Sequence, residues 1–119
     1  MNKSIIGKVN AVAIYISWLF LAILSVGLGF LMFNIQTDEV AVLLISGFGG
    51  LMLFSFIHLI LSLFVRCPSC NKCLTAQGFR TPKNDPDGRP NNWAYVAVRW
   101  FSGAVFCIHC DAKVNTNSL

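Results

Sequence analysis

Charged side chains are scarce in this chain. Only 12% of its 119 residues are Asp, Glu, Lys or Arg, whereas 55% are hydrophobic. An ordinary soluble domain carries about 25% charged residues, roughly twice this share. The shortage argues against a soluble single domain, because too little polar surface remains to cover a small globule. It also argues against disorder, which requires low hydrophobicity and high net charge.

Motifs for catalysis are also missing. The chain has no Gly-rich phosphate loop, no nucleophile elbow, and no Glu beside a His-containing metal motif. Its five carboxylates leave hydrolysis and phosphoryl transfer without visible machinery. We therefore expect a protein that is not an enzyme.

Two long apolar stretches dominate the first half of the chain. Residues 9–33 include no Asp, Glu, Lys, Arg or His, and residues 40–65 include only His58. At 1.5 Å per residue, a helix over either stretch could cross a hydrocarbon core of about 30 Å. The first stretch is too long for a signal peptide, whose apolar region has about 7–15 residues. The sequence predicts a membrane α-helical hairpin of two transmembrane helices within residues 1–65.

The basic residues indicate how this hairpin is oriented. The connection Asn34–Glu39 has no Lys or Arg, Lys3 and Lys8 precede the first stretch, and seven basic residues follow Val65. Cytoplasmic flanks of membrane helices carry the excess of Lys and Arg. We therefore expect a multi-pass protein of the cell (inner) membrane with both termini in the cytoplasm.

Small and polar residues within the stretches are candidates for special roles. Ser25 and Gly29 are four residues apart, as are Ser46 and Gly50, and such spacing favours close helix packing in membranes, within the hairpin or between copies. His58 is a functional candidate, because it is the one residue among Asp, Glu, Lys, Arg and His within the two stretches. A neutral histidine bonded to a neighbouring helix is the simpler interpretation.

Cysteine pairs mark the second half of the chain. Cys67 and Cys70 form one Cys-x-x-Cys pair, and Cys107 and Cys110 form another. Two thiolates on one tight turn can bind the same cation, and two such turns give a closed tetrahedral site for Zn²⁺. The sequence predicts a structural zinc site, with iron as the alternative metal.

On these cysteines, residues 66 to about 114 resemble the zinc-ribbon family, whose metal sites are rubredoxin-type knuckles. The resemblance implies a small C-terminal β domain, here residues 66–119, with the four cysteines as ligands on two β-hairpins. It departs from the family in two ways. Asn71 and Asp111 stand where knuckles usually have Gly, although both residues tolerate a left-handed backbone. The separation of 36 residues between the pairs exceeds the usual 15–20.

An insertion accounts for the long separation. Residues 80–92 are rich in turn formers and predict an exposed loop. On either side we expect strands at 73–79, 93–101 and 104–106, with a turn at residues 102–103. Trp93, Arg99 and Trp100 are then candidates for contact with the membrane interface. Stacking of these aromatics on nucleic acid is the less favoured alternative.

Two residues near the ligands have open roles. Cys73 follows the first pair and is a small buried side chain, an alternate ligand or a reactive thiol. His109 lies between two predicted ligands, where a knuckle normally points the side chain outward.

Three hypotheses for function follow. The favoured one is a membrane-anchored zinc-ribbon module that recruits or regulates a protein partner. The second is a homo-oligomeric, pore-like membrane effector in which the zinc ribbon serves assembly or sensing. The third is a thiol redox or metal sensor that uses Cys73.

Overall fold

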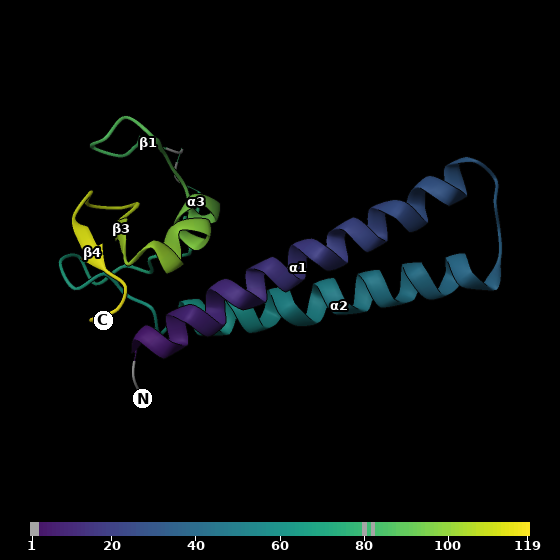
Figure 1. Ribbon diagram of the computed structural model, residues 1–119, viewed down its shortest axis with the longest axis horizontal. Coiled ribbons are helices and arrows are strands. Elements are labelled where there is room, and N and C mark those ends of the chain that lie inside the picture. Colours follow the sequence, from purple (N-terminus) through teal and green to yellow (C-terminus); the bar gives the residue numbers. More distant parts are fainter. Residues whose placement is uncertain (1–2, 80, 82) are drawn as a thin grey trace. The chain divides into compact units, whose positions relative to one another are not determined.

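The computed structural model describes residues 3–79, 81 and 83–119. Two long helices make up the first half of the chain: α1 spans Lys3–Met32 and α2 spans Asp38–Ser62. Figure 1 shows them joined by a short loop. No proline occurs before Pro68, so nothing interrupts the helical hydrogen bonds of either helix. The predicted helical hairpin is confirmed.

Local signals at the loop end α1 and begin α2. Asn34 takes a left-handed conformation with φ 59°, while its amide donates to Leu31 O at 2.9 Å and the Ile35 amide to Phe30 O at 3.0 Å. This pair of bonds is a Schellman motif, which satisfies the last carbonyls of a helix. Thr37 then caps α2 by accepting from the Val40 amide. The turn therefore lies where the sequence predicts the connection.

Three glycines bring the two helices together in the unit formed by Val12–Ile57. A Cβ atom added at Gly47 would lie 2.8 Å from the Leu24 amide nitrogen, and one added at Gly50 would overlap the Phe20 ring. A Cβ atom at Gly27 would lie 3.0 Å from the Leu44 side chain. The backbones approach closely because these positions have no side chain.

The sequence also predicted packing roles for Gly29, Ser25 and Ser46. A Cβ atom at Gly29 would meet open space. The hydroxyl groups of Ser25 and Ser46 donate to carbonyls of their own helices. Of the four small residues selected from the sequence, only Gly50 faces a neighbouring helix, and the spacing alone did not identify Gly27 or Gly47.

Large apolar side chains remain exposed along both helices. They include Leu19 at 60% exposure and Ile45 at 74%, and many others on each helix are similarly uncovered. Both helices are long and apolar enough, by length and composition, to cross a membrane. A core helix of a soluble protein would be mostly buried, whereas these are not.

The second compact unit comprises the chain up to Ala11 together with His58–Leu119. Its short elements are β1 Lys83–Asn84, β2 Pro90–Asn91, α3 Trp93–Val98, the 3-10 helix η1 Arg99–Ser102, β3 Ala104–Phe106 and β4 Lys113–Asn115. Strands β1 and β2 pair antiparallel, and so do β3 and β4, with Val105 opposite Val114. The unit has less sheet than the predicted zinc ribbon.

The prediction of a strand is wrong for two segments. Residues 93–101, predicted extended, form α3 and continue into η1. The side chain of Asn92 caps α3 by accepting from the Tyr95 amide at 2.8 Å, and the buried residues Val96, Ala97 and Trp100 follow helical spacing. Packing of one face has overridden the strand propensity of the aromatic and β-branched residues. Residues 73–79 form only an isolated bridge between Cys73 and Arg66.

Trp100 occupies the core of this unit, with 1% of its surface exposed. The expectation that it faces lipid headgroups is therefore wrong. Its ring lies against Gly7 of α1, where an added Cβ atom would overlap it. The buried cluster around it unites segments from both ends of the chain, namely Ile6, Ala11, Val65, Leu74, Val96, Val105, Ile108 and Val114.

Candidate metal centre

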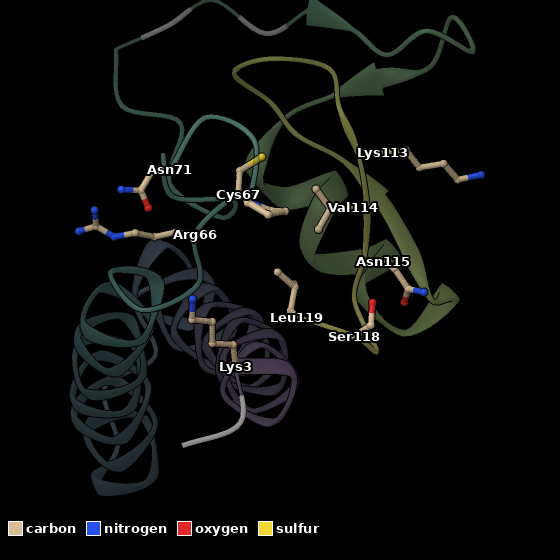
Figure 2. A pocket seen from close by; sticks show the side chains of 10 residues that line it. Lys3, Arg66, Cys67, Asn71, Lys113, Val114, Asn115, Ser118 and Leu119 are labelled. Atoms are coloured by element: carbon tan, nitrogen blue, oxygen red, sulfur yellow. The ribbon is translucent and has the colours of Figure 1, made fainter.

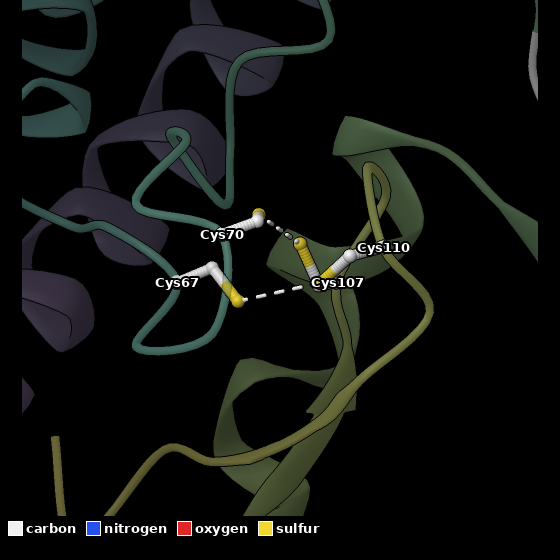
Figure 3. Close-up of side chains that lie close together, drawn as sticks. All are labelled: Cys67, Cys70, Cys107 and Cys110. Atoms are coloured by element: carbon white, nitrogen blue, oxygen red, sulfur yellow. Dashed lines mark hydrogen bonds between the residues drawn. The ribbon is translucent and has the colours of Figure 1, made fainter.

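Four cysteine sulfurs converge in this unit. The Sγ atoms of Cys67, Cys70, Cys107 and Cys110 all lie within 4.8 Å of one another. Figure 3 shows the two pairs facing each other across a small gap, one pair from each tight turn. The sulfurs of Cys67 and Cys110 are 3.7 Å apart, as are those of Cys70 and Cys107. The two Cys-x-x-Cys pairs therefore form one cluster, as predicted.

These separations suit a tetrahedral metal ion. With Zn–S bonds of about 2.3 Å, ideal tetrahedral geometry places the sulfurs about 3.8 Å apart. A disulfide requires about 2.05 Å, so none of the cysteines is paired covalently. The donor set also fits, because thiolates select zinc or iron over hard cations.

The two turns share one backbone design, called here the first knuckle (residues 67–72) and the second knuckle (residues 107–112). Asn71 and Asp111 each follow a second cysteine and have φ values of 57° and 59°. The predicted left-handed positions are confirmed. Equivalent bonds close each turn: Asn71 N to Cys67 O, Cys67 N to Lys72 O, Asp111 N to Cys107 O and Cys107 N to Ala112 O, at 2.9–3.0 Å.

The sulfurs differ in environment. Cys67 and Cys107 are buried, whereas Cys110 is exposed. Burial raises the pKa of the Cys107 thiol. Burial also acts to raise the pKa of Cys67, but hydrogen bonds from the amides of Cys70 and Ser69, together with those to the sulfurs of Cys107 and Cys110, outweigh it and lower that pKa to about 7. Amides that donate to a sulfur favour the thiolate, which is the form that binds a metal.

Cys73 and His109 lie outside the cluster of four sulfurs. The His109 ring approaches the carbonyl of Cys73 at 3.1 Å and that of Ala76 at 3.3 Å through Nε2. A carbonyl can only accept, so Nε2 carries the proton and is not a metal ligand. His109 instead joins the second knuckle to the segment that follows the first.

The insertion between the knuckles forms a small hairpin of β1 and β2. At its turn, Asp85 accepts from the Arg89 amide at 2.8 Å through one carboxylate oxygen. Asn91 at its end is buried and donates from Nδ2 to Cys107 O at 3.4 Å. The described part of the predicted loop is mostly exposed, and Arg80 and Pro82 lie outside the described residues.

His58 lies at the edge of the same unit, in a network that the sequence did not reveal. Its Nδ1 lies 2.8 Å from Oδ1 of Asn10, and Nδ2 of Asn10 donates to the Thr75 hydroxyl at 2.9 Å. Asn10 and Thr75 are almost fully buried. Asn10 has a polar amide side chain inside an apolar stretch, and this exception was the feature of the sequence that could have indicated the network.

The remaining candidates lie on α3 and η1. Trp93 is 37% exposed, and its ring centroid lies 6.0 Å from that of His58. The guanidinium of Arg99 lies over the Tyr95 ring at 5.5 Å. Trp93 and Arg99 therefore lie on the surface, unlike Trp100.

Comparisons of the chain with protein-family models, with curated proteins and with solved structures give no match. The evidence for a metal-binding module is therefore the geometry of the four cysteines itself.

Proposed function

We propose that this chain is a non-enzymatic zinc module anchored in the cell (inner) membrane by its two long helices. The zinc ion is structural, both termini face the cytoplasm, and the module recruits or regulates a protein partner. The observation that carries the proposal is the approach of four cysteine sulfurs within 4.8 Å of one another, with two of the sulfur–sulfur distances at 3.7 Å.

The choice of zinc follows from the ligands and their surroundings. Four thiolates in a closed tetrahedral arrangement are typical of structural zinc sites. The cluster also joins the core, since Cys67 and Cys107 pack with Leu74, Val96 and Trp100. A metal at this place would tie the two knuckles together, so that its binding energy supports the fold of the whole unit.

The non-enzymatic role follows from the same ligand set. A catalytic zinc keeps one position open for water or substrate, whereas four cysteines fill the tetrahedron. What the module would offer a partner is a rigid surface whose shape depends on the metal.

The membrane anchor is supported by the two helices. Each has a mean hydropathy of 2.3 over its most apolar window, and their exposed apolar side chains need a nonpolar environment. The basic flanks and the absence of Lys and Arg from residues 34–39 favour a cytoplasmic zinc unit.

Metal analysis of the full chain, purified from membranes in mild detergent, tests the proposal. We expect one zinc per chain and an X-ray absorption spectrum with four sulfur neighbours at about 2.3 Å. A nitrogen or oxygen ligand in the first coordination shell, or the absence of bound metal, would contradict it. Iron bound by the same four sulfurs would support the metal site but would change the cofactor from zinc to iron.

A further inference from the structure

A pocket of about 400 Å³ lies beside the first knuckle. It is bounded by the start of α1, the segment after α2, the first knuckle, β4 and the residues that follow β4. Its polar lining includes Lys3, Arg66, Asn71, Lys113, Asn115 and Ser118. At this volume it is at the lower end of the range for small-molecule sites, and it suits a compact ligand group.

The charged side chains of the lining are all cationic. Three cationic side chains come from three separate segments, and no residue that lines the pocket has an acidic side chain. Figure 2 shows Lys3 extending from α1 toward the first knuckle, with Arg66 and Lys113 on opposite sides of the pocket and their charged ends directed away from one another. The three charges make the surroundings of the pocket positive, which attracts an anion.

The neighbouring groups are hydrogen-bond donors. Nε of Arg66 donates to Leu63 O at 3.0 Å, which fixes the side chain and leaves its terminal amino groups for a ligand. Asn115 uses Oδ1 to accept from the Asn117 amide at 2.9 Å, which leaves its amide nitrogen as a donor. Arginine, lysine and amide donors together are the groups that bind phosphoryl oxygens.

We propose that this pocket binds a phosphoryl group. On the membrane anchor of the proposed function, the source is the headgroup of an anionic phospholipid. Lys3 is the first residue of α1, and Arg66 comes shortly after α2 ends at Ser62, so both would lie at headgroup level. Soluble phosphate offers the same chemistry, and the experiment separates the two sources.

Native mass spectrometry of the full chain in detergent measures the lipid. Phosphatidylglycerol and phosphatidylcholine are added separately, and we expect one phosphatidylglycerol to be retained with at least tenfold preference. The variant Lys3→Gln, Arg66→Gln, Lys113→Gln should weaken its binding on the order of a hundredfold, at about fivefold for each cation. The matched control is Lys72→Gln, Lys83→Gln, Arg89→Gln, which removes the same charge outside the pocket and should retain binding.

Inorganic phosphate tests the second source. Titration into the chain in neutral micelles should shift the backbone amide resonances of Asn71 and Asn115 in the wild type and not in the pocket variant. Phosphate shifts without a preference for phosphatidylglycerol support a soluble ligand, and retention of the lipid supports the headgroup.

Three results would overturn the inference: no binding of either probe, equal loss in the control variant, or unchanged binding in the pocket variant. Zinc content is measured on every sample. A wild type that binds phosphatidylglycerol at this pocket but holds no metal would contradict the proposed function and leave the pocket intact. A wild type that holds zinc but binds neither anion would contradict the pocket inference and leave the proposed function intact.

Discussion

The His109 ring donates from Nε2 to the Cys73 carbonyl at 3.1 Å and so connects two segments that are 36 residues apart in the chain. The same nitrogen also approaches the Ala76 carbonyl at 3.3 Å. The histidine between Cys107 and Cys110 thus connects the second knuckle to the segment that follows the first.

Replacing His109 by Ala should therefore destabilise the unit without removing its metal. The loss removes a hydrogen bond to part-buried carbonyl groups, which costs about 0.5–1.5 kcal/mol in the free energy of unfolding. Chemical denaturation in detergent, with zinc content measured in parallel, checks this. Loss of stoichiometric zinc from the His109→Ala variant would identify the ring as a ligand instead.

The four clustered cysteines should differ sharply from the fifth. Cys70→Ser should lose the zinc and unfold the region after Arg66, because metal binding and folding are coupled in so small a unit. Cys73→Ser, whose sulfur lies outside the cluster, should retain one zinc per chain. Zinc analysis and hydrogen exchange compare the two variants. Equal metal loss in both would show that the ligand set is wrong.

Gly7 should tolerate no side chain. A Cβ atom there would overlap the Trp100 ring, and overpacking of a core costs about 1–3 kcal/mol. Gly29→Ala, on the same helix with open space around it, is the control and should change stability little. Thermal unfolding of both variants in one detergent measures the difference. A Gly7→Ala protein as stable as the control would show that α1 does not pack on Trp100.

Topology can be measured by labelling single cysteine probes from each side of the membrane. In a Cys73→Ser background, an impermeant maleimide should label Gln36→Cys from outside and Asn117→Cys only after the membrane is opened. The reason is the absence of Lys and Arg from the loop and their abundance in the flanks. External labelling of Asn117→Cys in intact cells would show that the orientation is opposite to the predicted one.

Local features account for what the sequence determined about this protein. Apolar length predicted both helices, because backbone groups in long apolar segments satisfy each other along the helix. The Cys-x-x-Cys spacing predicted the two knuckles, and Asn71 and Asp111 took the left-handed conformation because each knuckle closes there. Each of these properties depends on residues within a few positions of one another.

Only the tertiary structure decided the rest. Residues 93–101 have strand propensity, but one face of a helix buries Val96, Ala97 and Trp100 against distant segments, among them Gly7. The pairing of Asn10 with His58 and Thr75, and the gathering of Lys3, Arg66 and Lys113 around one pocket, unite the two ends of the chain. Such contacts depend on which surfaces pack together, and packing between residues far apart in sequence leaves no periodic pattern to read.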